Sequence, residues 1–183
     1  MTGDPLHRDA VRVLTGWAPE SERDRANRQR ALDLLTAGPD TLRRGHAPGH
    51  VTSSAVVVHA DRERVLLCLH GRFHQWCQVG GHCEDGDTTL AGAALREATE
   101  ESGIAGLRVD PVLIGFDIHP VTCSGGPSHH FDARFAVLAP PGAVEAVSEE
   151  SDALGWFRLD ALPSPLASAT EEVLAPALAR FAR

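Results

Sequence analysis

The stretch of sequence that decides the fold is residues 80–104, GGHCEDGDTTLAGAALREATEESGI. Two glycines and a short acidic turn precede a segment in which small apolar residues recur at helical spacing. This pattern predicts a helix that is capped by Asp87 or Thr88 and stopped by Gly103 in a left-handed conformation. Its small side chains favour close packing of the helix against a sheet.

Three glutamates of this helix, Glu97, Glu100 and Glu101, fall within an arc of roughly 100°. Like charges at this spacing cost roughly 0.2–0.5 kcal/mol per pair. A divalent cation would remove the repulsion, because Mg²⁺ prefers oxygen ligands. Arg96 can orient a neighbouring carboxylate, and Gly81 lets a backbone carbonyl approach a metal and its phosphate ligand. Alternatively, such an acidic run is an ordinary solvated face.

The segment REATEESGI, residues 96–104, is similar to the second half of the Nudix hydrolase signature. That signature is Gly, five residues, Glu, seven residues, Arg-Glu, an apolar residue, any residue, Glu-Glu, any residue, Gly and an apolar residue. The first half departs from it, because five residues after Gly81 stands Asp87 rather than Glu, and eight residues separate Asp87 from Arg96. One extra residue in the turn explains this spacing, and it makes Asp87 a cap or a loop support.

The resemblance covers roughly residues 50–180 and implies an α+β fold, a Nudix-like α/β/α sandwich with a mixed sheet. It implies hydrolysis of a diphosphate linkage in a nucleoside diphosphate-linked or related small molecule, by attack of water on phosphorus with Mg²⁺ or Mn²⁺. The implied catalytic residues are Arg96, Glu97, Glu100 and Glu101. The implied metal ligands are Gly81, Glu97, Glu100 and Glu101.

The resemblance leaves two alternatives to a hydrolase. One is a non-catalytic module that senses a nucleotide or nucleotide sugar; a pure sensor has no need of the full set of Arg96 and three glutamates, so the set favours catalysis. The other is isopentenyl diphosphate isomerase, which shares the fold, but the motifs of that enzyme are not found. The identity of the substrate stays open, because specificity resides in loops.

The segment SHHFDARFAV, residues 128–137, alternates polar and apolar side chains as a half-buried strand does. Its polar positions are candidates for substrate binding: His130, Asp132 and Arg134. If the preceding strand-like segment pairs with it, Asp117 and His119 join the same face, where they would meet substrate or a second metal. The alternative is the solvent-facing side of an antiparallel sheet.

Further candidates for the functional site lie outside these two segments. Trp76 would either stack on a base of the substrate or pack in the core. Glu149, Glu150 and Asp152 occupy a place where the family often supplies one more metal ligand or base, and they are equally typical of ordinary surface.

The rest of the chain predicts a helical extension over residues 1–48 and a Nudix-like domain over 49–183. The extension contains amphipathic helices at 5–17 and from Ser21 to about Gly38. It covers the main domain or an oligomer interface, so a homodimer is one expected assembly; a substrate lid is the alternative. The domain contains strands in 50–70, at 107–118 and at 129–138, a loop at 71–81, an apolar segment LGWFRL, and a closing helix near 164–182.

The charge and the cysteine content of the chain restrict the partners and the compartment that we expect. The chain has 17 basic and 25 acidic side chains and a net charge of −8, which disfavours nucleic acid polymers and anionic membranes. Its four cysteines form no CxxC pair, which favours a reducing compartment and predicts no zinc site. No signal peptide or spanning segment is recognised, so the expected location is the cytoplasm.

Overall fold

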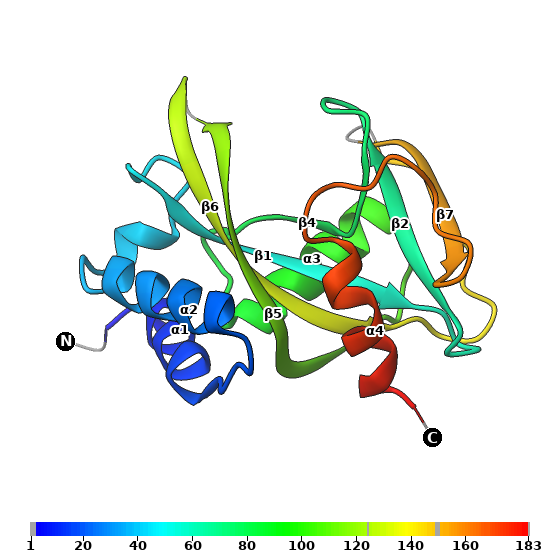
Figure 1. The fold of residues 1–183 in the computed structure, drawn as a ribbon, viewed down its shortest axis with the longest axis horizontal. Helices are drawn as coiled ribbons and strands as arrows, with labels where there is room; N and C mark the ends of the chain where they lie inside the picture. The colour runs from blue at the N-terminus through cyan, green and yellow to red at the C-terminus, as the bar shows by residue number, and fades with distance from the viewer. Residues whose placement is uncertain (1–2, 124, 149–150, 183) are drawn as a thin grey trace.

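A computed structural model describes residues 3–123, 125–148 and 151–182 (Figure 1). Four α-helices lie in the described part: α1 Pro5–Gly16, α2 Glu22–Leu35, α3 Leu90–Ser102 and α4 Glu171–Arg180, with a 3₁₀ helix η1 at Pro39–Leu42. The strands are β1 His50–Val58, β2 Arg64–His70, β3 Trp76–Cys77, β4 Val79–His82, β5 Arg108–Cys123, β6 Gly126–Leu138 and β7 Ser151–Arg158. Within these ranges, no helix is both long enough and apolar enough to cross a membrane.

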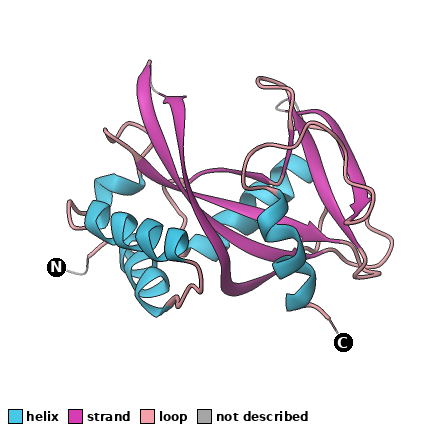
Figure 2. Ribbon diagram, in the orientation of Figure 1, coloured by secondary structure: helices cyan, strands magenta, loops and turns pink. Residues whose placement is uncertain are grey.

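The strands form one mixed sheet in the order β3-β2-β1-β6-β5, while β4 also pairs with β1 and β7 with β2. Strand β1 is parallel to β6 and antiparallel to β2 and β4. Every residue of β1 is buried, as expected for a central strand that is covered on both faces. The long β5–β6 hairpin crosses the molecule in Figure 2 and extends beyond the helices at one end.

Helices α3 and α4 cover opposite faces of the sheet (Figure 1). Alternate residues of β1 account for this, because Val57 belongs to the core cluster of α3 whereas Val56 and Val58 belong to the cluster of α4. This arrangement confirms the predicted α+β fold, an α/β/α sandwich with a mixed sheet.

The N-terminal helices share the core of the sheet. Leu6 and Leu14 of α1 and Leu35 of α2 are buried in the same cluster as α3, and Trp17 packs against Phe116 of β5 with ring centroids 6.3 Å apart. The extension therefore covers the main domain, which is one of its two predicted roles. A division of the chain at residue 48 and a homodimer interface stay predictions.

The turn between β1 and β2 is fixed by one carboxylate. Asp61 accepts hydrogen bonds from the amide of Glu63 (2.9 Å) and from Nε of Arg64 (2.7 Å), and it pairs with His59 (3.0 Å). Burial raises the pKa of Asp61, but these bonds outweigh burial and lower the pKa to about 2.

Several element boundaries differ from the predicted ones. The helix of the glutamates is capped by Thr89, whose side chain accepts from the amide of Gly92 (3.0 Å), and not by Asp87 or Thr88; its stop at Gly103 is confirmed. Helix α2 has the predicted Ser21 cap but ends at Leu35.

The region expected as a single loop before the box contains the short strands β3 and β4. The closing helix begins at Glu171, because the segment before it pairs with β3: the Trp76 amide donates to Pro165 (2.9 Å), and the Ala167 amide donates to Trp76 (2.9 Å).

Candidate active site

Helix α3 turns two of its three glutamates toward the sheet. The side chain of Glu97 is 13% exposed and Glu101 is 8% exposed, whereas the side chain of Glu100 is 58% exposed. Residues four apart lie on one face of a helix, so Glu97 and Glu101 approach strand β4 together and Glu100 lies at the rim. The carboxylates are therefore at the edge of a packed surface.

The twin glycines of β4 make this approach feasible. The amide of Gly80 donates a hydrogen bond to Oε1 of Glu101 (2.8 Å). A Cβ atom on Gly81 would lie 2.7 Å from Oε2 of Glu97, and one on Gly80 would lie 2.3 Å from Cβ of Ser54. At Gly80 the obstacle includes the backbone of Ser54, so only glycine fits there, whereas a Cβ at Gly81 would displace the carboxylate of Glu97.

Arg96 neutralises and orients the acidic groups around it. Its Nη1 donates to Glu97 and to Glu100 (both 3.0 Å), and its Nη2 donates to the carbonyl of His82 (2.9 Å) and to Asp87 (3.0 Å). Burial lowers the pKa of Arg96, but the bond to Asp87 and the charges of Asp87 and Glu97 outweigh burial, so the pKa is raised above its ordinary value. The guanidinium ties the helix to the turn before it.

Asp87 supports that turn. Its carboxylate, 9% exposed, accepts from the amide of Glu84 (2.8 Å) as well as from Arg96. Asp87 thus gives Arg96 a carboxylate partner outside the helix.

Asp9, a residue of α1 that was not predicted from the sequence, holds the first turn of α3. Its Oδ2 accepts from the amide of Leu90 (2.8 Å), and the carboxylate also pairs with Arg12. A buried carboxylate at a helix N-terminus satisfies a free amide and complements the helix dipole. No local pattern could indicate this contact, because the two residues are far apart in the chain.

The predicted polar face of the sheet exists, and part of it is buried. Arg134 donates from Nε to Asp132 (2.9 Å) and from Nη1 to the carbonyl of Ala169 (2.7 Å), and its Nη2 lies 3.4 Å from Asp117. Asp132 also accepts from the hydroxyl of Ser54 (2.8 Å). These bonds join β1, β5 and β6 to the loop before α4. A substrate-binding role for His130, Asp132 and Arg134 stays a prediction.

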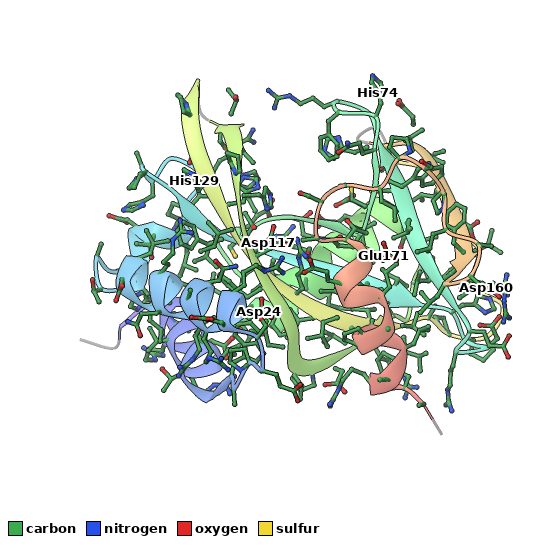
Figure 3. All side chains as sticks on the ribbon, in the orientation of Figure 1. Asp24, His74, Asp117, His129, Asp160 and Glu171 are labelled. Carbon is green, nitrogen blue, oxygen red and sulfur yellow. The ribbon has the colours of Figure 1, made fainter. Side chains whose placement is uncertain are left out.

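Asp117 and His119 lie on this face beside His130, as the alternation predicted. Burial raises the pKa of Asp117, but a hydrogen bond with His119 (3.0 Å) and the charge of Arg134 outweigh burial and lower it. Burial lowers the pKa of His130 to about 3, helped by neighbouring histidines. Figure 3 labels Asp117 near the middle of the sheet and His129, the neighbour of His130, on the extended part of the hairpin.

Two histidines and a cysteine that sequence reasoning did not single out lie against His130: His50, His82 and Cys123. Burial lowers the pKa of His50 and lowers the pKa of His82 to about 4. The sequence offered one signal for this group, because His50 and Thr52 are polar residues at alternate positions of β1. Placing His50 beside His130 also required the pairing of β1 with β6.

The two other described candidates, Trp76 and Asp152, contact residues outside α3. The half-buried ring of Trp76 packs edge-on against Phe157, with centroids 5.0 Å apart, in the cluster around α4. Asp152, in β7, pairs with His74 (3.0 Å). Glu149 and Glu150 lie outside the described residues, so their predicted role stays untested.

Comparison with known proteins relates the chain to a family. The sequence model of the NUDIX domain matches residues 49–180. The structure is similar to a MutT NUDIX hydrolase from Burkholderia pseudomallei, with 29% identity, a TM-score of 0.52 and coverage of 72% of this chain and 97% of that chain. It also resembles a UDP-X diphosphatase, with 20% identity, a TM-score of 0.54 and coverage of 97% of each chain.

The second likeness is at the level of fold alone, and it includes the N-terminal helices. A search of curated proteins found no match.

Proposed function

Since the chain belongs to the NUDIX family of pyrophosphohydrolases, we propose that it cleaves a diphosphate linkage in a nucleoside diphosphate-linked or related small molecule. The proposed reaction depends on a divalent metal and proceeds by attack of water on phosphorus. The observation that carries the proposal is the approach of Glu97 and Glu101 to the twin glycines of β4. It gathers hard oxygen ligands beside the backbone of β4.

The donor set fits Mg²⁺ or Mn²⁺. In phosphate-transferring sites Mg²⁺ takes one or two carboxylates, with waters and substrate phosphates as its other ligands. The carboxylate of Glu97 occupies the space that a Cβ on Gly81 would fill. We assign Glu97, Glu101 and the carbonyl of Gly81 to the metal. When bound, such a cation supplies Lewis-acid stabilisation of phosphate charge and a more acidic water.

The chain's own residues position the reaction. Arg96 holds Glu97 and Glu100 in fixed orientations through its two 3.0 Å bonds. Glu100 is the most exposed of the three glutamates, so it has room to reach a water molecule. We assign Glu100 to metal ligation or to proton acceptance from the attacking water, a task that requires hydrogen-bond reach to that water.

The test is a panel of diphosphate compounds incubated with Mg²⁺ or Mn²⁺, with the products identified to locate the broken bond. The panel contains nucleoside triphosphates, oxidised nucleotides, ADP-ribose, UDP-linked sugars, dinucleoside polyphosphates and coenzyme A. We expect metal-dependent turnover of one class. Glu101→Gln should lower kcat by about 100- to 1000-fold, while Glu22→Gln, an exposed glutamate of α2, should leave it unchanged.

Full activity in Glu101→Gln would refute the assignment of the glutamates. Tight binding of one compound with no turnover across the panel would refute hydrolysis and support the sensing module.

We further propose that the protein acts in the cytoplasm and that its partner is the small-molecule substrate. All four cysteines lie in the described ranges and none forms a disulfide, which suits a reducing compartment.

A further inference from the structure

Four side chains that take no part in the proposed metal and acid–base chemistry of the glutamates meet on one face of the sheet. They form a group that we name the His/Cys cluster: His50 of β1, His82 of β4, Cys123 of β5 and His130 of β6. One nitrogen or sulfur atom of each lies within 4.8 Å of those of the others. The three imidazole rings contact one another, with centroids 5.0–5.1 Å apart.

Strand register holds this cluster in place. His50 and His130 are direct partners in the parallel β1–β6 ladder. His82 is the partner of Thr52, two residues along β1 from His50, so the two histidines share a face. Cys123 lies at the end of β5, four residues after the partner of His130, and so faces the same way. Ligands carried by paired strands are positioned before any metal binds.

The distances suit a tetrahedral ion. Sγ of Cys123 lies 3.5 Å from Nε2 of His82 and 4.0 Å from Nε2 of His50. Zinc bonds of about 2.3 Å to sulfur and about 2.0–2.1 Å to nitrogen give sulfur-to-nitrogen edges of about 3.5 Å in a tetrahedron. One edge already has this length, and small side-chain rotations would shorten the others.

Unsatisfied nitrogens provide an independent observation. His50 is fully buried, and its Nδ1, like Nε2 of His130, makes no hydrogen bond to any part of the chain that the structure describes. A buried polar atom without a partner costs about 1–3 kcal/mol, and native proteins rarely leave one without a reason such as an ion. Bonding of Nε2 of His130 to a cation would relieve this cost at His130, whereas His50, which presents Nε2 to Cys123, would keep its Nδ1 as the protonated nitrogen.

We propose that the His/Cys cluster binds one Zn²⁺ ion in a tetrahedral site that is separate from the glutamate site. Imidazole and thiolate ligands select Zn²⁺ over Mg²⁺, which requires oxygen. Four protein ligands close the coordination sphere, as in structural rather than catalytic zinc sites. Binding replaces the thiol proton of Cys123, which passes to solvent, while the neutral imidazoles bind through their lone pairs.

The bound ion would fasten the β5–β6 hairpin to β1 and β4. Strand β4 also carries Gly80 and Gly81, so zinc would hold the glycines that face the glutamates of α3.

Cobalt substitution tests this proposal without any need for turnover. The full chain is stripped with a chelator and titrated with Co²⁺ in excess Mg²⁺, which saturates oxygen sites. The wild type should bind one Co²⁺ per chain, with an intense tetrahedral spectrum and a thiolate-to-cobalt charge-transfer band. Cys123→Ser should lose that band and bind Co²⁺ at least about 100-fold more weakly. Cys83→Ser is the matched control, because this buried cysteine directly follows His82 but packs in the core cluster of α3; it should keep the band.

A double variant, Glu97→Gln with Glu101→Gln, separates the two metal sites. It should retain the full cobalt spectrum, whatever the outcome of the hydrolase assays. A weak octahedral spectrum in the wild type, a charge-transfer band that persists in Cys123→Ser, or loss of the spectrum in the double variant would each overturn the zinc site. The wild-type spectrum decides the question alone if Cys123→Ser fails to fold.

Discussion

Substitution of Gly81 by alanine tests the central contact of the active site. The added Cβ would lie 2.7 Å from Oε2 of Glu97 and 2.9 Å from its Cδ. Ordinary van der Waals contact begins near 3.4 Å, so the carboxylate must recede by about 0.7 Å. Mg²⁺ tolerates little departure from bond lengths of 2.0–2.1 Å, and a 1 Å misplacement can cost about 100-fold in rate. We therefore expect kcat to fall by about 10- to 100-fold, which is about 1.4–2.7 kcal/mol in activation free energy.

The fold should survive this substitution. The atoms displaced belong to the far end of a flexible side chain, so we expect the free energy of unfolding to change by less than about 1 kcal/mol. The measurements are kcat on the compound turned over in the panel and urea denaturation of the same samples. Gly16→Ala, at the end of α1 with nothing within 4 Å of the added atom, is the control. A folded Gly81→Ala protein with wild-type kcat would show that the position of Glu97 does not limit catalysis.

Three further substitutions probe stability, each measured by urea denaturation. Gly80→Ala puts a Cβ 2.3 Å from Cβ and 2.4 Å from Cα of Ser54, so it should destabilise the fold by about 3 kcal/mol; a loss below 1 kcal/mol would contradict the tight β1–β4 contact. Asp9→Ala removes the cap on the Leu90 amide and should cost about 1–2 kcal/mol, whereas an unchanged midpoint would show that α1 does not support α3. Asp61→Asn removes a carboxylate whose pKa is about 2 in the fold and ordinarily 3.8, so its stabilising contribution is complete above about pH 4 and is lost as the pH falls toward 2. Since this side chain is partly exposed, the variant should be less stable by only about 1 kcal/mol at pH 7 and should match the wild type near pH 2; a constant difference across this range would refute the titration.

The helix of the glutamates was predictable because its signals are local. The apolar spacing, the left-handed stop at Gly103 and the set of acids are all contained within one segment. Its start was misplaced, because three consecutive residues, Asp87, Thr88 and Thr89, are all good caps. Tertiary contacts decided among them, since Asp87 is taken by Arg96.

The His/Cys cluster was not predictable from the sequence, because its members are far apart in the chain. The spacing of the cysteines predicted no zinc site, and the structure leads us to propose one with a single cysteine and three histidines. Its members come from four strands, and only the parallel pairing of β1 with β6 brings His50 to His130. Zinc motifs that can be recognised in sequence keep their ligands close along the chain. A site assembled by sheet register has no such pattern.

For the polar face of the sheet, the sequence predicted which side of the strand the residues occupy but not that some of them are buried. Alternation correctly placed Asp132 and Arg134 on one side of β6, yet both are buried and bonded to each other. The loop that covers them, which includes Ala169, precedes a helix whose predicted start was several residues too early. Burial of a polar face depends on which distant segment folds over it, and the sequence of a single strand does not contain that information.

The most direct test of the active site is anomalous diffraction at the manganese edge from crystals soaked in Mn²⁺. We predict an anomalous peak bonded to the carboxylates of Glu97 and Glu101 and to the carbonyl of Gly81. The account would be contradicted if those oxygens bound no manganese while the same protein hydrolysed a diphosphate compound with Mn²⁺ in solution.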